Sequence, residues 1–284
     1  MRVLLTGADG QLGGEIAHAW NTDDVIRFTR ASLDVTDRAA VEAAVTEVRP
    51  GLVLNAAAFT NVDACETAIE LAFATNAFGP MHLADACREH GATLLHISTD
   101  YVFDGTAQSP YSERDTPHPC SIYGLSKATG EQLVRGRLSA HYIVRTAGLY
   151  GGQAARPKPT NFVDRMLQLA QQGQSLRVVD DQVTAPTSAG GLATTLREIV
   201  AGAPYGTYHA TNAGECSWFE FARAIFELSG VEASVTPISS AEYGAPAMRP
   251  AYSVLANNAL AAAGITPMRH WREALAEYLR DRSV

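Results

Sequence analysis

Tyr123 and Lys127 stand four residues apart in the segment Tyr-Gly-Leu-Ser-Lys. On a helix this spacing places both side chains on one face, with β-carbons roughly 5 to 6 Å apart. A free phenol has a pKa near ~10, and a fixed ammonium beside it lowers that pKa by stabilising the phenolate. The pair could therefore act as a general acid, although the same spacing also arises as a plain surface pair on amphipathic helices.

A glycine-rich turn near the N-terminus predicts a dinucleotide site. It follows an apolar run and precedes an amphipathic segment, which is the context that distinguishes such a site from a mere turn. The first glycine permits a tight turn, the second lets the backbone approach a pyrophosphate, and the third lets helix and strand pack closely. The helix N-terminus then offers free N–H groups to the phosphates. The cofactor-binding candidates here are Gly7, Asp9, Gly10, Gln11, Leu12 and Gly13.

The end of the second expected strand indicates which adenosine the site prefers. An acidic residue there binds the ribose 2′-hydroxyl, whereas a basic residue receives a 2′-phosphate. The chain has Phe28-Thr29-Arg30 at this point, with no carboxylate. Arg30 is therefore the candidate partner for the 2′-phosphate of NADPH, with a solvated loop residue as the alternative. Asp34 and Val35 are the candidates to border the adenine ring.

Composition and charge exclude several function classes. Hydrophobic residues make up 46% of the 284 residues and charged residues 18%, as in ordinary globular proteins. The net charge of -8 argues against nucleic acid or an anionic membrane as the main partner. No apolar run is long enough to span a bilayer, and the glycine-rich turn begins too early for a signal segment. The four cysteines and eight histidines lack metal-ligand spacing, so we expect reduced thiols, no metal and a cytoplasmic protein.

Short apolar runs alternate with longer helical patterns through the first half of the chain. This alternation is typical of βαβ units on a parallel sheet. The expected strands are 3–6, 25–28, 52–55, 93–98 and 142–145, and the expected helices are 12–20, 38–48, 68–89 and 123–138. We therefore expect an α/β fold, a Rossmann doubly wound parallel sheet, with the Tyr and Lys near its crevice.

The pattern loosens after Gly151, where prolines and glycines separate shorter elements. We expect a smaller C-terminal α/β substrate lobe made of 148–186 and about 211–284. The Rossmann domain would then comprise 1–147 plus about 187–210, because an apolar helical segment at 188–200 is expected to return to it. The segments 218–228 and 271–278 are expected amphipathic helices of the smaller lobe.

Several motifs in the same order resemble the extended short-chain dehydrogenase/reductase superfamily and, within it, the dTDP-4-dehydrorhamnose reductase family. The likeness runs nearly end to end, which makes it far more specific than any single motif. It rests on residues 6–13, 55–63, 76–80, 98–105, 123–127, 145–146, 161–162, 179–182, 208–212 and 249–250.

This resemblance implies roles for the candidate residues. Tyr123 would donate a proton to the C4 ketone of a sugar, Lys127 would lower the pKa of Tyr123 and hold the nicotinamide ribose, and Thr99 would bond the carbonyl oxygen. NADPH would supply the hydride, and use of NADH stays open. Further residues implied at the cofactor are Asn55, Ala56, Ala57, Ala58 and Asn76. Those implied at the substrate, besides Thr99 and Tyr123, are Thr60, Val62, Asp100, Tyr101, Asn161 and Arg249.

Other residues have a structural interpretation or depart from the family pattern. We expect Asp180-Asp181-Gln182 to form a lobe-joining turn and His209 to be a hydrogen-bonded core residue. Many family members have a Trp where this chain has Gly148, so either the pocket is wider or another side chain such as Tyr150 takes its place. Some members form a magnesium-bridged dimer. Glu15 matches one ligand, but 189–192 lacks an acid, so we predict no bridging metal and leave a homodimer open.

The leading hypothesis is an oxidoreductase that reduces the C4 ketone of a dTDP-4-keto-6-deoxyhexose with NADPH, with dTDP-4-dehydro-L-rhamnose as the foremost substrate. Three alternatives stay open. The chain could reduce another dTDP-4-ketosugar, as in antibiotic deoxysugar biosynthesis. It could be a nucleotide-sugar epimerase or dehydratase, which recycles a tightly held NAD. In a different class, it could be a non-catalytic NADP-binding regulatory subunit.

Overall fold

The computed structural model describes residues 1–152 and 161–282. Its centre is a six-stranded sheet in the order β10-β5-β4-β3-β1-β2, in which every pair is parallel. The strands are β1 Arg2–Thr6, β2 Asp24–Phe28, β3 Leu52–Asn55, β4 Thr93–Thr99, β5 His141–Thr146 and β10 Gly206–His209. The predicted parallel Rossmann sheet is confirmed, and its strand order reverses between β1 and β3, where such sheets bind ligands.

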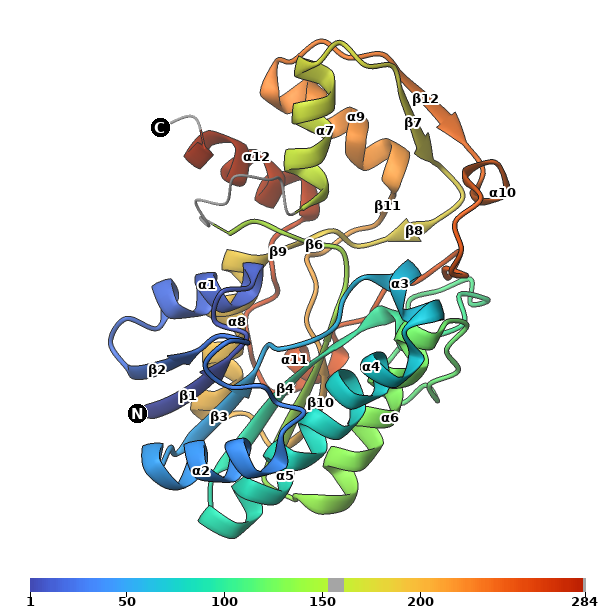
Figure 1. Cartoon of the computed structure of the whole chain (residues 1–284). Coiled ribbons are helices and arrows are strands. Elements are labelled where there is room, and N and C mark those ends of the chain that lie inside the picture. Colours follow the sequence, from blue (N-terminus) through green and yellow to red (C-terminus); the bar gives the residue numbers. More distant parts are fainter. Residues whose placement is uncertain (153–160, 283–284) are drawn as a thin grey trace.

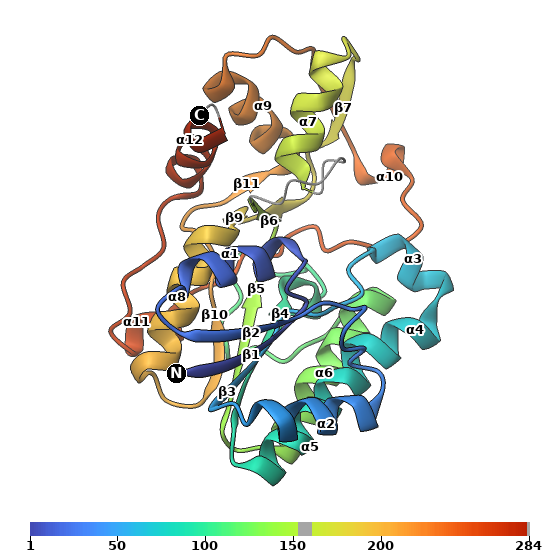
Figure 2. The ribbon, with the colours of Figure 1, turned by 60° about the vertical axis from the view of Figure 1, so that its left-hand side comes forward.

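Helices cover both faces of this sheet (Figures 1 and 2). One face carries α1 Gln11–Ala19, α8 Ala189–Gly202 and α11 Asn258–Ala262, and the other carries α2 Arg38–Val48, α5 Gly79–His90 and α6 Ile122–Arg137. Short elements follow β3 and β4, namely α3 Val62–Thr67, α4 Ile69–Phe73, η1 Ala74–Phe78 and η2 Asp100–Val102. A sheet buried on both faces explains why its strands are continuous apolar runs.

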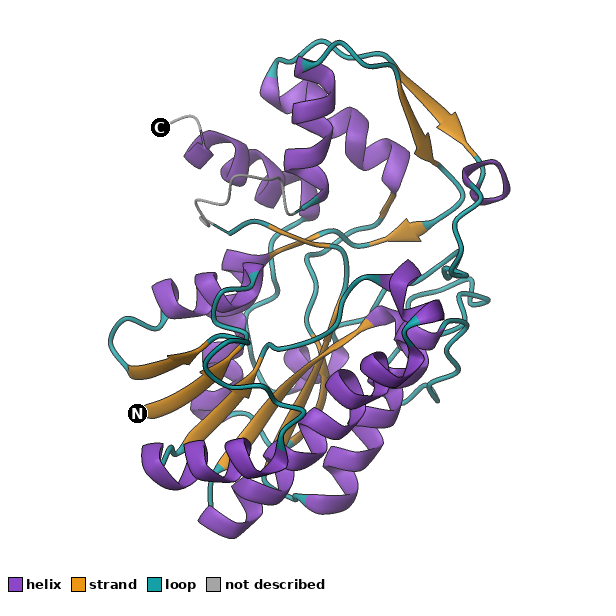
Figure 3. Ribbon diagram, in the orientation of Figure 1, coloured by secondary structure: helices purple, strands orange, loops and turns teal. Residues whose placement is uncertain are grey.

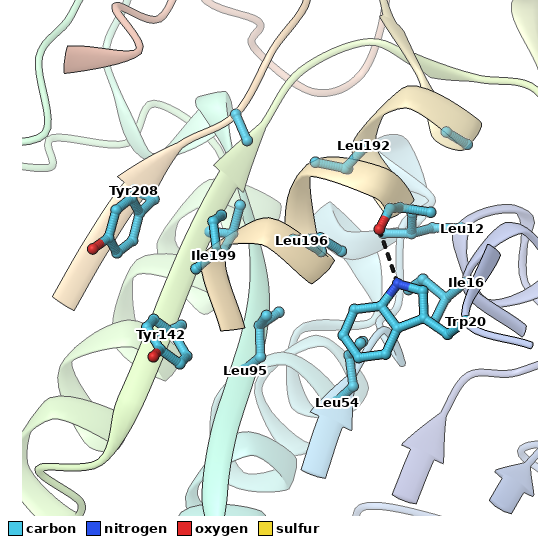
Figure 4. Close-up of a cluster of buried hydrophobic side chains, with 14 of the residues drawn as sticks. Leu12, Ile16, Trp20, Leu54, Leu95, Tyr142, Leu192, Leu196, Ile199 and Tyr208 are labelled. Atoms are coloured by element: carbon cyan, nitrogen blue, oxygen red, sulfur yellow. Dashed lines mark hydrogen bonds between the residues drawn. The ribbon is translucent and has the colours of Figure 1, made fainter. Parts of the chain in front are cut away.

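The core under α1 and α8 confirms that the segment at 188–200 returns to the sheet. Trp20 is fully buried and its Nε1 donates a 2.9 Å hydrogen bond to the Ala193 carbonyl, which joins the two helices (Figure 4). Leu192, Leu196 and Ile199 of α8 pack into the same cluster. Burial of such side chains contributes roughly 1.5 to 3 kcal/mol each.

A second, smaller lobe lies beyond the carboxyl ends of the sheet strands (Figure 3). Its helices are α7 Phe162–Gln171, α9 Trp218–Ser229, α10 Ser240–Tyr243 and α12 Trp271–Arg282. Three strand pairs complete it: β7 Leu176–Val179 with β12 Val235–Ile238, β8 Val183–Thr184 with β11 Cys216–Ser217, and β6 Leu149–Tyr150 with β9 Thr187–Ser188. No helix within the described ranges is long and apolar enough to cross a membrane.

The exact division into two domains stays our proposal, with one amendment. Leu260 of α11, with Ile265 and Met268 after it, packs in the core cluster under the sheet. We therefore assign the stretch around α11 to the sheet domain, although we expected all of about 211–284 in the smaller lobe. Part of the expected segment 148–186, residues 153–160, lies outside the described residues.

The helix expected at 68–89 is present as the continuous helical stretch α4, η1 and α5, but the π-helical turn at Ala74–Phe78 within it was not predicted. The Gly79 N–H reaches back five residues to the Ala74 carbonyl. Pro80 follows and has no N–H to continue the α-helical pattern. On the facing helix, a β-carbon on Gly130 would overlap the Asn76 carbonyl oxygen, so α6 and the π turn are in backbone contact.

A buried ion pair fixes α6 to the sheet. Arg145 of β5 donates from Nε and Nη2 to the two carboxylate oxygens of Glu131, at 2.9 and 2.7 Å. Both side chains are at most 1% exposed. Ser98 of β4 donates to the same carboxylate at 2.6 Å, and Arg135 donates at 2.9 Å. The network joins α6 to two adjacent strands.

Replacing Glu131 with Gln should destabilise the fold by about 3 to 5 kcal/mol, because it leaves the Arg145 charge buried without a counter-ion. Urea unfolding followed by tryptophan fluorescence measures this loss. The matched control is Glu277→Gln, which breaks an exposed pair with Arg269 and should cost less than about 1 kcal/mol. Equal losses in the two variants would show that the buried pair does not hold α6.

Candidate active site

The three predicted catalytic residues come together from β4 and α6. Thr99 ends β4, and Tyr123 and Lys127 lie on the first two turns of α6, which Ser121 caps by accepting from the Gly124 N–H. A β-carbon on Gly124 would overlap the Tyr101 carbonyl oxygen, so only glycine lets the helix start this close to the chain that leaves β4.

Burial has the largest effect on the Tyr123 phenol. Burial raises the pKa of Tyr123 above its usual value, and the Thr99 hydroxyl opposes this only in part. Lys127 Nζ donates a 2.6 Å hydrogen bond to the Ile97 carbonyl of β4. That Lys127 lowers the phenol pKa stays a prediction. Burial lowers the pKa of Lys127 to about 8, against the opposing charge of Glu131.

A cavity of about 440 Å³ opens above the carboxyl ends of β1, β3 and β4. Nine of the predicted cofactor residues line it: Gly10, Gln11, Leu12, Gly13, Ala56, Ala57, Ala58, Tyr123 and Lys127. Thr60, Thr99 and Asp100, which we predicted at the substrate, line it as well. Residues that we did not predict at the cofactor complete the lining, namely Ile97, Ser98, Thr146, Ala147, Gly148 and Leu149. Thr146 ends β5 and residues 147–149 follow it, so the parallel sheet topology is the signal that could have found them.

This cavity suits a dinucleotide. Gly7 has φ +68°, and a β-carbon there would lie 2.7 Å from the Ala56 backbone. A β-carbon on Gly13 would overlap the Gly7 carbonyl oxygen, so the turn depends on both glycines. Among the residues that the structure describes, Gln11 Nε2 and Thr146 Oγ1 are buried here without a hydrogen-bond partner. Two unpaired polar atoms beside a glycine turn fit a polar ligand.

The residues predicted at the adenosine end lie beside the glycine turn rather than in the cavity wall. The Ala8 N–H bonds the Phe28 carbonyl at 3.0 Å, which places the end of β2 against the turn. Arg30 is exposed just after it, and Asp34 accepts hydrogen bonds from Thr36, which with the nearby Arg30 charge lower the Asp34 pKa. Gly7 and Asp9 belong to the turn itself. Val35 is buried in the core against α5.

The two predicted asparagines hold the protein backbone. Asn55 is fully buried, and its Oδ1 accepts from Thr6 Oγ1 at 2.7 Å and from the Ala57 N–H at 3.2 Å. Asn76 in the π turn bonds both backbone polar groups of Phe59 and donates to Ser126 Oγ on α6. We therefore propose that Asn55 and Asn76 position the cavity wall and α6 and do not themselves contact the cofactor.

A second cavity, of about 240 Å³, lies between the sheet and the smaller lobe. It shares Thr60, Thr99, Asp100, Tyr123 and Gly148 with the first. Six predicted substrate residues line it: Thr60, Val62, Thr99, Asp100, Tyr101 and Tyr123. The smaller lobe closes it with side chains that we did not predict there, namely Gln182, Val183, Thr184, Trp218, Pro250 and Ser253. Tyr123 therefore faces both cavities.

Asn161 and Arg249 have structural contacts in this conformation. Asn161 caps α7 by accepting from the Asp164 N–H at 3.0 Å. Arg249 forms a two-point ion pair with Asp63 of α3, with distances of 3.1 and 2.9 Å, and stands directly before Pro250 in the second cavity wall. A substrate contact by either residue stays a prediction.

Comparisons with known proteins place the chain in a family. All residues from 1 to 284 match the family model described as the RmlD substrate binding domain. A dTDP-4-dehydrorhamnose reductase of Streptomyces griseus is 45% identical and aligns over 97% of this chain and 92% of its own length. This chain belongs to the dTDP-4-dehydrorhamnose reductase family.

Two further similarities describe the range of the family. A probable dTDP-4,6-dihydroxy-2-methyloxan-3-one 4-ketoreductase of Streptomyces antibioticus is 42% identical over 99% of this chain and 95% of its own length. The crystal structure of the dTDP-4-dehydrorhamnose reductase of Bacillus anthracis in complex with NADP superposes with a TM-score of 0.94. It is 39% identical and covers 99% of both chains.

The structure shows which aromatic side chain stands where this chain lacks the family tryptophan. Gly148 has φ +51°, and a β-carbon there would lie 3.5 Å from Cη2 of Trp218, whose ring lines the second cavity. Trp218 begins α9, seventy residues further along the chain. Tyr150, the replacement that we had named, is fully buried among Phe221 and Tyr278 in the core of the smaller lobe. The choice of Tyr150 was wrong.

Two acidic segments are used differently. Asp180 accepts from Ser217 and Asp181 from Ser240, and both bonds lie within the smaller lobe, so the lobe-joining turn stays a prediction. Gln182 also lines the second cavity. Asp100 is buried in both cavity walls, where it accepts from Thr99 and Ser253, and burial raises its pKa to about 6. Within the described residues, no group of three or more His, Cys, Asp or Glu side chains could hold a metal.

His209 and the four cysteines, for which we predicted no catalytic role, behave as expected. His209 is fully buried, and its Nδ1 lies 3.1 Å from the Tyr111 carbonyl and 3.2 Å from the Ala256 carbonyl. The four cysteines are free thiols, and burial raises the pKa of Cys65 to about 11. Neither kind of side chain adds a reactive group to the two cavities.

Proposed function

We propose that this chain reduces the C4 ketone of a dTDP-4-keto-6-deoxyhexose with NADPH, and that dTDP-4-dehydro-L-rhamnose, reduced to dTDP-L-rhamnose, is its substrate. One observation carries this proposal: Tyr123 stands in the wall shared by a dinucleotide-shaped cavity and a second cavity of different lining. A proton donor at that position lies where the cofactor in the first cavity and the ketosugar in the second would adjoin.

The side chains of the two cavities orient the cofactor and the ketosugar and donate a proton. NADPH, when bound, contributes the hydride. Tyr123 keeps its proton at neutral pH, since burial raises its pKa, and a ketone reduction needs a general acid in its protonated form. Thr99 lies beside the phenol, and its hydroxyl donates to Asp100. When the ketone binds, this hydroxyl can rotate from Asp100, so that both hydroxyls donate to one carbonyl oxygen. The small side chains of Ala56 to Ala58 leave room for the cofactor.

The preference for NADPH rests on two observations. The related Bacillus anthracis enzyme was solved with NADP. In this chain Arg30 is exposed beside the glycine turn, where a 2′-phosphate would lie. We propose that Arg30 binds this phosphate and that NADH is the weaker cofactor.

A second ketosugar substrate is favoured by the lining of the second cavity. The Streptomyces antibioticus relative is named for a different ketosugar and is about as similar to this chain as the rhamnose-type relative. In this chain the aromatic wall comes from Trp218 rather than from position 148. Because the Trp218 side chain reaches the second cavity from α9, the alternative substrate is a ketosugar whose ring carries other substituents than that of rhamnose.

Epimerase, dehydratase and regulatory functions fit less well. Thr99, Tyr123 and Lys127 are all present around one cavity, which argues against a subunit without catalysis. An epimerase or dehydratase would retain its NAD through purification and would not consume added NADPH. We also propose a cytoplasmic enzyme without nucleic-acid or membrane partners, on the grounds of the net charge of -8, and leave a homodimer as an open proposal.

Replacing Tyr123 with Phe should lower kcat roughly 10² to 10⁴ fold, because the phenol is the proton donor. The assay follows NADPH oxidation by absorbance with a dTDP-4-ketosugar. Tyr205→Phe removes an exposed phenol outside both cavities and should leave the rate unchanged. Wild-type turnover by the Tyr123 variant would remove the residue from its proposed role.

Replacing Arg30 with Ala should weaken NADPH binding roughly ten- to hundredfold and leave NADH binding nearly unchanged, because only NADPH carries the 2′-phosphate. Isothermal titration with each cofactor measures both affinities. Arg223→Ala, an exposed arginine on α9, is the control. If the variant lost equal affinity for NADPH and NADH, Arg30 would have no part in binding the 2′-phosphate.

Replacing Trp218 with Ala should raise KM for the ketosugar roughly three- to tenfold, since an aromatic contact contributes about 0.5 to 1.5 kcal/mol beyond its buried area. Trp218→Phe should restore most of the affinity. The KM for NADPH should not move, because Trp218 lines only the second cavity. A larger effect on NADPH than on the ketosugar would contradict this assignment.

A further inference from the structure

A buried row of side chains leads from the first strand to the candidate catalytic lysine. Thr6 Oγ1 lies 2.7 Å from Asn55 Oδ1, and Asn55 Nδ2 lies 3.0 Å from His96 Nδ1. His96 Nε2 in turn lies 3.4 Å from Lys127 Nζ. All four side chains are at most 2% exposed, so each of their polar atoms depends on this row and its neighbours.

The orientation of the Asn55 amide is fixed at one end of the row. The Ala57 N–H, which can only donate, points at Asn55 Oδ1 from 3.2 Å. Thr6 Oγ1 donates to the same atom. A rotated amide would set its NH₂ group against the Ala57 N–H and leave both donors unpaired. The NH₂ group of Asn55 therefore faces His96.

The tautomer of His96 follows from this orientation. Its Nδ1 must accept the hydrogen bond from Asn55, so the ring proton is on Nε2. The ring is neutral, because complete burial and the nearby Lys127 charge keep the pKa of His96 well below its ordinary value. The Nε2–H group then points at Lys127 Nζ.

An ammonium group and a neutral amine meet this N–H differently. An ammonium has three donors and no acceptor, so it would oppose the His96 donor. A neutral amine has a lone pair that accepts the Nε2–H, while one of its own hydrogens still reaches the Ile97 carbonyl at 2.6 Å. We propose that His96 is a positioning residue that stabilises Lys127 as the neutral amine and so promotes transfer of the Lys127 proton to Tyr123. This role rests on the proposed ketone reduction.

The proton balance shows that His96 acts when the Tyr123 phenolate regains its proton. The Tyr123 O–H bond breaks as its proton moves to the carbonyl oxygen, which leaves a phenolate. The phenolate takes a proton from the Lys127 ammonium, and the electron pair of that N–H bond stays on Nζ, where His96 donates to it. Water then returns a proton to the amine. Besides His96, the titratable groups around Lys127 are Tyr123 and Glu131 of α6 and Asp100 across the cavity, with Glu131 paired to Arg145 and Arg135.

The tautomer is tested on the full chain without any substrate. Histidine labelled with ¹⁵N is incorporated, and long-range proton–nitrogen correlation spectra distinguish Nε2–H, Nδ1–H and doubly protonated rings. The His96→Phe variant identifies the signals of His96. We expect the Nε2–H form throughout about pH 6 to 9. An Nδ1–H form, or a ring that gains a proton in this range, would overturn the proposal.

The effect on Lys127 is tested by the pH profile of kcat with NADPH and a dTDP-4-ketosugar. In His96→Phe the alkaline limb should move up by about half to one pH unit, because loss of one hydrogen bond to the amine raises the Lys127 pKa. His96→Gln, whose amide can accept from Asn55 and donate to Lys127, should keep the wild-type limb. If the alkaline limb of the kcat profile does not move in a folded His96→Phe variant, then His96 has only a structural role. If wild-type protein reduced no ketosugar, the proposed function would fail, while the spectra would still decide the tautomer.

Discussion

The placement of helix α6 depends on the charge that Glu131 carries into the protein interior. A buried carboxylate is costly unless it is paired, and here Arg145 meets both of its oxygens from the neighbouring strand. The same arginine lies 5.1 Å from the centre of the Phe103 ring. These contacts hold α6 against the sheet one turn beyond Lys127 and two turns beyond Tyr123. Helix α6, which carries Tyr123, is therefore held in place by a buried ion pair as well as by apolar packing.

Two glycines of α6 allow the helix to lie close enough to its neighbours for that ion pair to form. Gly124 meets the chain after β4 and Gly130 meets the π turn, each in contact with a carbonyl oxygen. Such close backbone contacts leave no space for a β-carbon. They set Thr99, Tyr123 and the cofactor cavity in one place, while the smaller lobe adds the far wall of the second cavity. The candidate catalytic residues therefore come from the sheet domain, and both domains line the second cavity.

Much of the sheet domain could be predicted because its signals are local. Buried parallel strands are short apolar runs, and helix α2 is found at the expected residues. The contributions of Trp218 and Ser253 could not be predicted, because they reach the cavity from 119 and 154 residues beyond Thr99 and follow no periodic pattern. Glu131 left a signal that sequence reasoning passed over, since it lies one helical turn after Lys127 on the buried face. The effect of burial on the pKa of Tyr123 could not be predicted, because residue spacing does not show how deeply the phenol is buried.

The central claim is that Tyr123 completes a direct reduction of a ketone by an exchangeable cofactor. The most direct measurement uses NADPH that carries deuterium at the transferred position of C4, incubated with the enzyme and a dTDP-4-ketosugar, with the product followed by NMR and mass spectrometry. The account predicts one deuterium at C4 of the sugar for each NADPH consumed. A product with no deuterium, formed while added NADPH is not consumed, would contradict it and identify a recycled internal cofactor instead.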